Sequence, residues 1–309
     1  MLDVRRMRIL REVAEHGSIA GAAQALSFTP SAVSQQIATL ERETGVALVE
    51  RGPRSIRLTV AGRALAAHTD GVVASLEAAE AEIHAIAGVR GGMLRLASFP
   101  TAYATIMPPA LVEFRGRHPG VELTLTEADP LAALERVKSG ELDLALLYEY
   151  PYVPFPDDDA VQQVPLLEEP IRVLLPRGHA AARRRAVPLK ALADESWITS
   201  TARSSCHLFV ARVCRAAGFE PDIALESDDH AVWQGLVAAG AGVALAPDLA
   251  LEHLHPGVEA RPVALQPLVR RVFAAHRTGG RTPAVEAMLT VIEETVSARG
   301  FGPALADAS

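Results

Sequence analysis

Residues 17–41 read Gly17-Ser-Ile-Ala-Gly-Ala-Ala-Gln-Ala-Leu-Ser-Phe-Thr-Pro-Ser-Ala-Val-Ser-Gln-Gln-Ile-Ala-Thr-Leu-Glu41, and this stretch decides the fold of the amino-terminal region. It predicts two short helices joined by a tight turn. Ser18 is placed to cap the first helix, and Pro30, which is tolerated in the first turn of a helix, opens the second. Apolar residues recur at helical spacing in both. The second helix also carries a face of hydroxyl and amide side chains, which suits insertion into the major groove of DNA.

Direct DNA contacts are expected from this polar face. Glutamine bonds adenine in a bidentate manner and serine bonds several bases, so Ser34 and Gln35 are the predicted readers, and Thr29 is a predicted phosphate or base contact. The alternative is an ordinary helical hairpin with a solvated polar face. The full set predicted to contact DNA in this turn and helix is Thr29, Pro30, Ser31, Ser34 and Gln35.

The chain after the second helix favours the DNA-binding interpretation. Gly45 ends that helix, a short apolar strand follows, and Gly52-Pro53 makes a turn into another short strand. Two strands around such a turn form a wing. Arg51 and Arg54 on the wing are predicted to meet phosphates or the minor groove beside the recognition helix.

Residues 1–63 resemble the amino-terminal domain of the LysR-type bacterial transcriptional regulators. The resemblance departs at Val49, where the family usually carries a phenylalanine. It implies a transcriptional regulator that binds double-stranded operator DNA as a dimer or tetramer. Besides the helix-turn-helix, the matching positions are Leu40, Glu41, Gly45, Leu48, Arg51, Leu58, Thr59 and Gly62.

Charge is divided unevenly along the 309 residues. The formal net charge is -7, yet residues 1–63 hold nine arginines against six acidic residues, so the acidic excess lies in the remainder. A small basic module on an acidic body fits a DNA-binding protein. The start of the chain lacks the apolar segment of a secretory signal, and no apolar run is long enough to span a membrane. We therefore expect a cytoplasmic protein with no membrane partner, whose two cysteines are free thiols.

A single long helix is predicted over residues 59–87. A narrow apolar stripe on one helix indicates pairing with the same helix of a second subunit, and packing on the chain's own body is the alternative. The glycine-rich residues 88–92 are predicted to form a hinge. The stripe consists of Leu65, Val72, Leu76, Ala79, Ile83 and Ile86, with Thr69 in its one polar slot.

Beyond Gly92 the pattern alternates between strands and helices, which predicts parallel sheets wrapped by helices. Strands are predicted at 94–97, 121–125, 142–147, 171–175, 197–199, 223–226, 242–246 and 269–275. Helices are predicted at 100–117, 130–139, 205–217, 229–239 and 283–299. Because the last strand and helix exceed what the second set needs, we expect the chain to return to the first lobe, with crossing strands near 164–168 and 260–265.

The predicted fold class is thus α/β, with a winged helix-turn-helix, a linker helix and a two-lobed effector domain. This agrees with the LysR-type effector domain, which resembles periplasmic solute-binding proteins. The predicted boundaries are 1–60 for the DNA-binding domain, 61–90 for the dimerisation helix and hinge, and 91–303 for the effector domain. Lobe 1 covers about 91–164 and 266–303, and lobe 2 covers about 165–265.

Ligands of open α/β sheets bind at the carboxyl ends of strands, against the starts of the following helices. Three predicted strand ends carry hydroxyl or imidazole groups, and helix capping is the alternative role for the hydroxyls. Asp228 and Asp229 make an anion less favourable at the third. By the family resemblance, these loops hold a small effector, typically a carboxylate or aromatic acid. The predicted effector-binding residues are Ser98, Phe99, Pro100, Thr101, Thr199, Ser200, Ser204, Ser205, His207, Ser227 and His230.

Other function classes find less support. The sequence holds no nucleophile elbow, phosphate-binding loop, dinucleotide fingerprint or zinc-protease motif, so no catalytic residue, cofactor or metal site is predicted. An enzyme or a small-molecule binding protein without DNA binding is the alternative of another class. Within the family, a thiol redox sensor using Cys206 and Cys214 is the alternative. Eight residues on one intact helix span about 12 Å, which is too far for a disulfide unless the helix unwinds.

Overall fold

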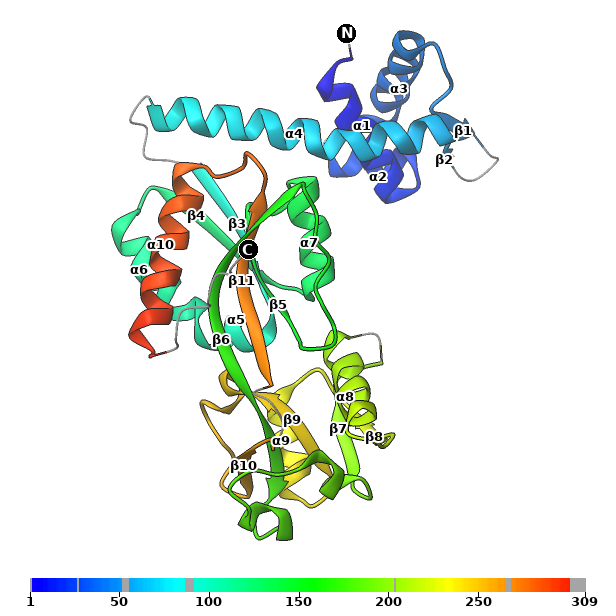
Figure 1. Cartoon of the computed structure of the whole chain (residues 1–309). Coiled ribbons are helices and arrows are strands. Elements are labelled where there is room, and N and C mark those ends of the chain that lie inside the picture. The colour runs from blue at the N-terminus through cyan, green and yellow to red at the C-terminus, as the bar shows by residue number, and fades with distance from the viewer. Residues whose placement is uncertain are drawn as a thin grey trace. The chain divides into compact units, whose positions relative to one another are not determined.

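The structure is a computed structural model that describes residues 2–26, 28–51, 56–86, 92–202, 204–264 and 268–300. The chain forms two compact units. The amino-terminal unit comprises residues 1–89 together with 138–141, and the carboxyl-terminal unit comprises 90–137 and 142–309. Figure 1 labels the elements of both units.

The amino-terminal unit contains the predicted helix-turn-helix. Ser18 caps α2 by accepting a hydrogen bond from the Gly21 backbone N at 3.0 Å. The second helix of the motif opens with Pro30 and ends at Gly45, which adopts a left-handed φ of 72°. Two short antiparallel strands follow, as predicted for a wing. The elements are α1 (Val4–His16), α2 (Ile19–Ala25), α3 (Pro30–Thr44), β1 (Val49–Arg51), β2 (Ile56–Leu58) and α4 (Val60–Ile86).

Two residues of the LysR-like pattern hold the wing against the helices. Glu41 near the end of α3 accepts hydrogen bonds from the backbone N–H groups of Leu48 at 2.8 Å and Val49 at 3.1 Å. Gly62 at the start of α4 packs so closely that a Cβ would lie 2.0 Å from the Leu48 carbonyl oxygen, so no larger residue fits without a shift. Val49 is buried in the same core. The shared pattern therefore has a packing reason at these positions.

The first half of α4 packs on its own unit. Leu65 contacts the small core, and Thr69 is buried and donates to the Leu65 carbonyl at 2.8 Å. Val72 and Leu76, by contrast, are 37 % and 49 % exposed. The beginning of the predicted stripe is therefore covered by the same chain, whereas Val72 and Leu76 are exposed to solvent. The side chains of Ala79, Ile83 and Ile86, and the predicted hinge residues 88–91, lie outside the described residues.

The carboxyl-terminal unit is built on one mixed sheet, in which the described strands run in the order β4-β3-β5-β11-β6-β9-β7-β8, with β10 also paired to β6. β3 is parallel to β4 and β5, and β7 is parallel to β8 and β9, whereas β6 and β11 pair antiparallel with their neighbours. The strands are β3 (Gly92–Ser98), β4 (Val121–Glu127), β5 (Leu144–Glu149), β6 (Val161–Pro176), β7 (Ser196–Thr199), β8 (Asp222–Glu226), β9 (Val243–Pro247), β10 (Val258–Pro262) and β11 (Val269–Arg277).

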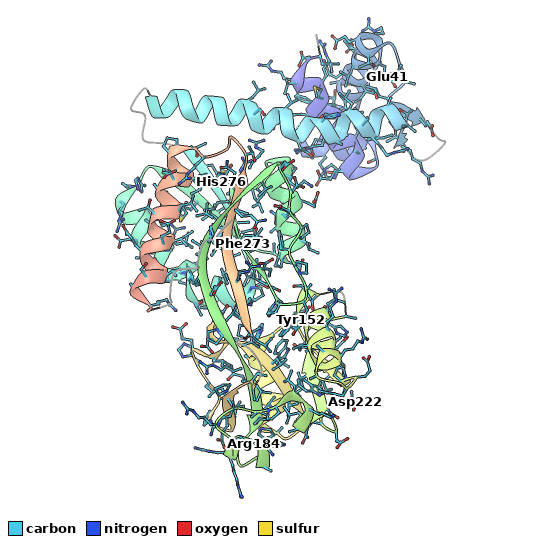
Figure 2. All side chains as sticks on the ribbon, viewed as in Figure 1. Glu41, Tyr152, Arg184, Asp222, Phe273 and His276 are labelled. Carbon is cyan, nitrogen blue, oxygen red and sulfur yellow. The ribbon has the colours of Figure 1, made fainter. Side chains whose placement is uncertain are left out.

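Helices divide this unit into two lobes that share the long strand β6. Lobe 1 has α5 (Pro100–Thr105), α6 (Met107–Arg117), α7 (Pro130–Ser139) and α10 (Pro283–Ala298), and lobe 2 has α8 (Ser205–Ala216) and α9 (His230–Ala238). Lobe 2 also holds the short 3-10 helices η1 (Ala180–Arg183), η2 (Leu189–Leu192) and η3 (Asp248–Leu251). Figure 2 places Phe273 and His276 on β11 in lobe 1, and Asp222 and Arg184 in lobe 2.

Three details of the predicted α/β pattern are wrong. The sheet is mixed, because the chain leaves lobe 1 on β6 and returns on β11 in the opposite direction. The predicted helix 100–117 is two helices, because Pro108 and Pro109 have no backbone N–H and so fit only the first turn of a new helix. The predicted crossing near 260–265 begins too early: residues 258–262 form β10, which pairs with β6 inside lobe 2, and the returning strand starts at Val269.

Candidate nucleic-acid interface and ligand cavity

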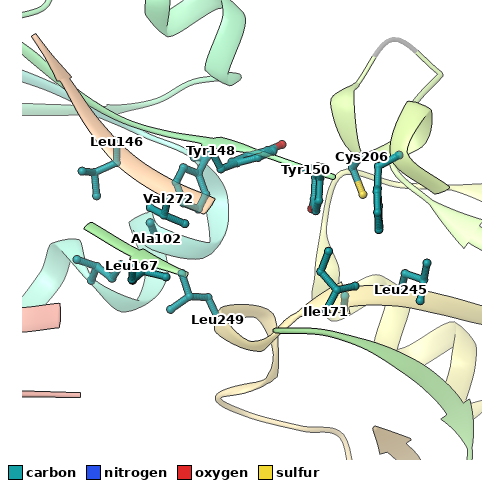
Figure 3. Packing of buried hydrophobic residues seen from close by; sticks show 14 of the residues in the cluster. Ala102, Leu146, Tyr148, Tyr150, Leu167, Ile171, Cys206, Leu245, Leu249 and Val272 are labelled. Atoms are coloured by element: carbon teal, nitrogen blue, oxygen red, sulfur yellow. The ribbon is translucent and has the colours of Figure 1, made fainter. Parts of the chain in front are cut away.

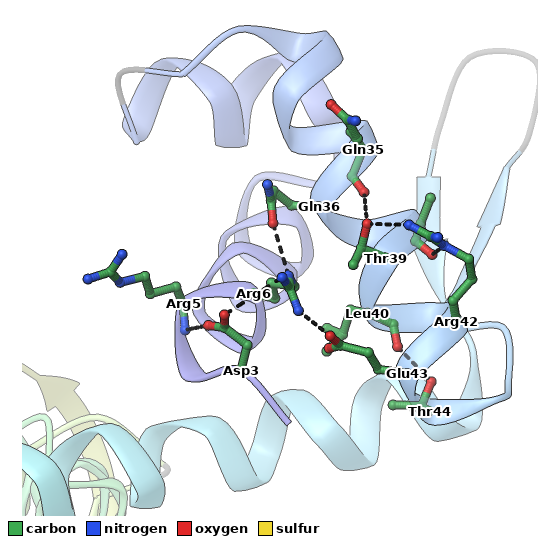
Figure 4. A network of polar contacts seen from close by, with 11 residues as sticks. Asp3, Arg5, Arg6, Gln35, Gln36, Thr39, Leu40, Arg42, Glu43 and Thr44 are labelled. Carbon is green, nitrogen blue, oxygen red and sulfur yellow. Dashed lines mark hydrogen bonds and ion pairs between the residues drawn. The ribbon is translucent and has the colours of Figure 1, made fainter. Parts of the chain in front are cut away.

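The helix α3 presents polar side chains on the face opposite its core residues. Val33, Ile37 and Leu40 are buried, whereas Ser31 and Gln35 are exposed and Ser34 is half-buried. Within the described residues, the side chains of Ser34 and Gln35 make no hydrogen bond. The Gln35 backbone carbonyl accepts one from the Thr39 hydroxyl at 2.9 Å, and Figure 4 shows the Gln35 side chain extending away from Arg6. These donors and acceptors are free for a partner outside the unit.

The adjacent Gln36 differs from Gln35, because its side chain is held inside the unit. Its Oε1 accepts a hydrogen bond from Arg6 Nε on α1 at 3.1 Å (Figure 4). Arg6 also pairs with the carboxylate of Glu43. Two neighbouring glutamines therefore have different roles: Gln36 ties α3 to α1, and Gln35 is free at the surface.

The turn before α3 contributes a cap that is also exposed. The Thr29 hydroxyl accepts from the Ala32 backbone N at 3.2 Å and lies 3.1 Å from the Ser31 hydroxyl, while Pro30 occupies the first helical position. Capping and DNA contact are compatible for Thr29, because its hydroxyl is exposed. On the wing, only the backbone of Arg51 is described, paired with Ile56. The Arg51 side chain and the whole of Arg54 lie outside the described residues.

A cavity of about 450 Å³ lies within the carboxyl-terminal unit, where residues of both lobes face one another. It lies at strand ends and helix starts, as expected for an open α/β sheet. Its size is in the range typical of small-molecule sites. The lining from lobe 1 is Phe99, Pro100, Thr101, Glu127, Ala128, Asp129, Pro130, Tyr148, Tyr150 and Arg270, and the lining from lobe 2 is Ser200, Thr201, Ser204, Cys206, Asp228 and His230.

A buried ion pair borders the cavity. Arg270 on β11 is 1 % exposed, and its Nε donates to Glu169 Oε1 at 2.7 Å while its Nη2 donates to the Thr101 hydroxyl at 2.8 Å. The other Glu169 oxygen accepts from the Leu249 backbone N at 2.7 Å. Burial lowers the pKa of Arg270, but the charge and hydrogen bond of Glu169, together with the neighbouring Tyr150 and Tyr148, outweigh burial and keep that pKa above its usual value. Nη1 has no acceptor among the described residues, so one donor group of this cation is left for a ligand.

Aromatic rings surround the Arg270 guanidinium. Its central carbon lies 4.8 Å from the ring centroids of Phe99 and Tyr148 and 5.8 Å from that of Tyr150. Phe99 and Tyr148 meet edge to face, which fixes the two rings. Figure 3 shows Tyr148 and Tyr150 extending toward Cys206 of lobe 2. Burial raises the pKa of Tyr148 to about 12, so the phenol stays protonated and the aromatic wall adds no charge.

Of the residues predicted to bind an effector, six line the cavity: Phe99, Pro100, Thr101, Ser200, Ser204 and His230. Ser204 also caps α8 by accepting from the His207 backbone N at 3.1 Å. The Thr101 hydroxyl likewise has a partner, because it accepts a hydrogen bond from Arg270 Nη2. The hydroxyl groups predicted here thus have structural partners, and their capping role and their place at the cavity coexist.

The other predicted effector residues do not line the cavity. Ser98 is buried and donates to the Phe99 carbonyl, and Thr199 is buried against Cys206. His207 Nδ1 lies 3.3 Å from both the Ser200 carbonyl and the Glu226 carboxylate, away from the cavity lining. The two remaining residues are Ser205, whose hydroxyl donates to Tyr148 at 3.4 Å, and Ser227, whose hydroxyl accepts from the Asp229 backbone N at 3.2 Å.

Sequence reasoning missed the residues at the centre of the cavity. Arg270 lies on β11, Glu169 on β6 and Tyr148 on β5, and Tyr150 directly follows β5, so no local motif joins these residues. One signal was present. The predicted strand 269–275 is largely apolar except for Arg270 and Arg271, and a charged residue that alternation turns toward the core indicates either a partner or a function, although the sequence alone does not show which of the two arginines is buried.

The environment of the two thiols disfavours the thiolate form. Cys206 and Cys214 are free and buried on the unbroken helix α8. Burial raises the pKa of Cys206, and it raises that of Cys214 to about 12. Reactive cysteines have a lowered pKa, because the thiolate is the nucleophile. Among the described residues, no group of three or more His, Cys, Asp or Glu side chains is placed to hold a metal ion.

Comparison with known proteins identifies the family. Residues 4–63 match the family described as "Bacterial regulatory helix-turn-helix protein, lysR family", and residues 87–297 match the family described as "LysR substrate binding domain". The chain belongs to the LysR family. It is a DNA-binding transcriptional regulator with a substrate-binding domain, and LysR regulators bind operator DNA and small-molecule effectors and form oligomers.

Relatives of this LysR regulator extend over most of its length. It is 30% identical to the "Probable HTH-type transcriptional regulator LrrA" of Synechococcus elongatus, over 95% of this chain and 97% of that protein. It is 34% identical to a "Probable hydrogen peroxide-inducible genes activator" of Mycobacterium avium, over 79% and 78% of the two chains. Its fold is similar to that of a full-length OxyR variant from Pseudomonas aeruginosa, with a TM-score of 0.71, 23% identity and coverage of 96% and 95%. Within the described residues, no helix is sufficiently long and apolar to span a bilayer.

Proposed function

We propose that this LysR regulator reads operator DNA with the exposed face of α3 and binds a small effector in the cavity beside Arg270. Occupancy of the cavity then changes the affinity for DNA. The observation that carries the proposal is Nη1 of Arg270. Nε and Nη2 of this guanidinium donate to Glu169 and Thr101, whereas Nη1 has no acceptor among the described residues and the side chain lines the cavity. A charged donor that borders a cavity and has no acceptor among the described residues is a candidate contact for a ligand.

The DNA contacts we propose are those of the exposed polar surface. Ser31, Ser34 and Gln35 provide base contacts, and Thr29 and Pro30 place the start of α3 against a phosphate. Arg51 and Arg54 of the wing neutralise phosphates, which adds affinity without sequence preference. The Gln35 amide has no hydrogen-bond partner among the described residues, which supports its role as a reader, because an amide of this kind bonds adenine through two hydrogen bonds.

The effector contacts we propose are those of the cavity lining. Thr101 and Ser200 offer hydroxyls, Arg270 offers the charged donor, and Phe99 and Tyr148 offer flat apolar walls. We propose that the cavity binds the effector without converting it chemically. We also propose that the protein acts in the cytoplasm, where its DNA lies. The coupling free energy between such a site and a DNA-binding site is typically about 1–3 kcal/mol.

A thermal-shift screen of the full-length chain tests the ligand site. Ala128→Trp fills the cavity with a large side chain, and Ala104→Trp adds the same side chain at an exposed position of α5 outside the cavity lining. A ligand present at about a hundred times its Kd stabilises the protein by about 2.7 kcal/mol, which is a shift of several degrees in Tm.

We expect that one or more small polar organic molecules will raise the Tm of the wild type and of Ala104→Trp and will leave the Tm of Ala128→Trp unchanged. If no compound in a broad panel separates the two tryptophan variants, the cavity is not the effector site.

A further inference from the structure

The effector cavity carries charge of both signs. The buried side is the Glu169–Arg270 pair, whose charges cancel. Three further carboxylates line the cavity, those of Glu127, Asp129 and Asp228, and all three residues are exposed to solvent. The cavity therefore combines a buried guanidinium with an acidic outer part.

The three outer carboxylates have no cationic partner within the described part of the chain. Asp129 Oδ1 accepts from the Leu131 backbone N at 3.0 Å, and Asp228 Oδ1 accepts from the Thr201 backbone N at 3.1 Å. The Thr201 hydroxyl also donates to Asp228. Glu127 makes no hydrogen bond to any described side chain. These contacts fix the position of two carboxylates but leave their negative charge uncompensated.

His230 adds a second unsatisfied polar group on the inner side. It lines the cavity, and its Nε2 is buried and has no hydrogen-bond partner among the residues that are described. Burial lowers the pKa of His230 to about 3, and the charge of Arg270 contributes to this shift. The imidazole is therefore neutral, and it offers a hydrogen bond without a second positive charge.

These features select against ligands of a single charge. A simple carboxylic acid satisfies Arg270 Nη1, but its negative charge is repelled by the three outer carboxylates. A simple amine satisfies those carboxylates and leaves the buried donor of Arg270 unpaired. Like-charge contacts and unpaired buried polar groups are each unfavourable for binding. A molecule with one group of each sign avoids both penalties.

We propose that the effector is a zwitterionic amino acid, whose carboxylate binds Arg270 Nη1 and whose ammonium group binds the carboxylates of Asp129 and Asp228. The inference rests on the proposed function, since it names the ligand class of the same cavity. The rings of Phe99 and Tyr148 and the small residue Ala128 leave an apolar wall for the ligand's side chain. A volume of about 450 Å³ is sufficient for an amino acid.

Calorimetric titration of the full-length protein tests this ligand class. The probes are the twenty common L-amino acids, each with its deaminated acid and its decarboxylated amine; for L-phenylalanine these are 3-phenylpropanoate and phenethylamine. We expect at least one amino acid to bind, and both of its singly charged analogues to bind about tenfold or more weakly, because each loses a charge-assisted hydrogen bond.

Two substitutions should reduce the preference of the cavity for the amino acid over its deaminated acid. Asp129→Asn and Asp228→Asn keep an oxygen that accepts the same backbone hydrogen bonds, so the loops retain their anchors. The amino acid should bind about tenfold more weakly to each variant, while the deaminated acid binds equally or more tightly than to the wild type. Glu122→Gln, an exposed change on the same strand as Glu127 but outside the cavity lining, is the matched control and should change neither affinity.

The outcomes separate this inference from the proposed function. If the deaminated acid binds as tightly as the amino acid, and Ala128→Trp abolishes that binding, the zwitterion is wrong and the effector cavity stands. If no amino acid binds, or if one binds equally to the wild type and to both asparagine variants, the zwitterion is also wrong. If binding of every probe is insensitive to Ala128→Trp, both the ligand class and the cavity are wrong.

Discussion

The polar surface of α3 and the cavity beside Arg270 are built in opposite ways. Gln35 is exposed on a helix whose other face forms the core, and its side chain has no partner among the described residues, so water can satisfy its amide. Arg270 and Glu169 are buried, and each compensates the charge of the other. A polar group in water carries no folding penalty, whereas a buried charge must be paired within the fold. Substitutions of the unpartnered side chains on the exposed face of α3 should therefore change binding alone, and substitutions at the cavity should change both binding and stability.

The largest effect should come from Arg270→Ala. This change leaves the Glu169 carboxylate buried without its partner, and we expect it to lower the free energy of unfolding by about 3–5 kcal/mol. Urea denaturation of the full-length protein measures the loss. The double variant Glu169→Gln with Arg270→Met is the control, because it removes both charges together and should recover most of the stability. A loss below about 1 kcal/mol for Arg270→Ala would mean that the pair is not buried in solution.

The reverse pattern is expected for Gln35→Ala on α3. It should reduce discrimination between a selected operator and a scrambled duplex by about 1–3 kcal/mol, because the bidentate contact is lost. The free energy of unfolding should change by less than about 0.5 kcal/mol, as for other exposed positions. Fluorescence anisotropy with a duplex selected from a random pool measures the discrimination.

Gln36→Ala is the matched control, since Gln36 is bonded to Arg6. It should cost about 1 kcal/mol of stability and leave discrimination intact. Equal discrimination by wild type and Gln35→Ala would show that another part of the unit reads the DNA.

A pH effect should appear at the cavity and not on α3. Because the pKa of His230 is lowered to about 3 in the folded state, the unfolded chain binds one more proton between that pH and about 6.5. Stability contributed by this group is therefore present above pH 6.5 and is lost as the pH falls, by up to about 1.4 kcal/mol per pH unit. Replacing His230 with Gln should reduce the slope of unfolding free energy against pH between 6 and 4. An unchanged slope would mean that His230 is accessible to solvent.

The smallest effect is expected at the turn before α3. Thr29→Ala removes the cap on the Ala32 backbone N–H and should cost about 1 kcal/mol of stability. Thr29→Ser keeps the hydroxyl and should restore it, which separates capping from DNA contact. If Thr29→Ser restores stability but DNA affinity stays reduced, the threonine methyl group contacts the DNA.

The same contrast explains what the sequence could predict. The helix-turn-helix lies within one continuous stretch, so its cap at Ser18, its end at Gly45 and its polar face follow from residue types and their spacing, whereas the capping role of Thr29 was found only in the structure. The loops at the cavity could be located because the carboxyl ends of parallel strands share an edge. Arg270 could not be assigned, because its partners Glu169 and Thr101 are 101 and 169 residues away in the chain. Such a pairing depends on the order of strands in the folded sheet.

Some helix and strand boundaries could be predicted only in part from the sequence. Two adjacent prolines at 108 and 109 signal the start of a new helix, and the predicted single helix 100–117 did not take them into account. The long strand β6 is predicted as two pieces, 164–168 and 171–175, because Glu168, Glu169 and Pro170 interrupt its apolar residues. Its antiparallel pairing with β11 depends on the path of the whole chain.

Thermodynamic linkage between the cavity and the DNA-binding surface is the decisive property to measure. The affinity of the full-length protein for its selected operator should be measured by anisotropy with and without a saturating cavity ligand, and the affinity for that ligand should be measured by calorimetry with and without the operator. We expect both affinities to change by the same factor, about 5 to 150. We also expect Ala128→Trp to remove the effect of the ligand on DNA binding. Equal DNA affinity with the cavity filled and empty would contradict this linkage.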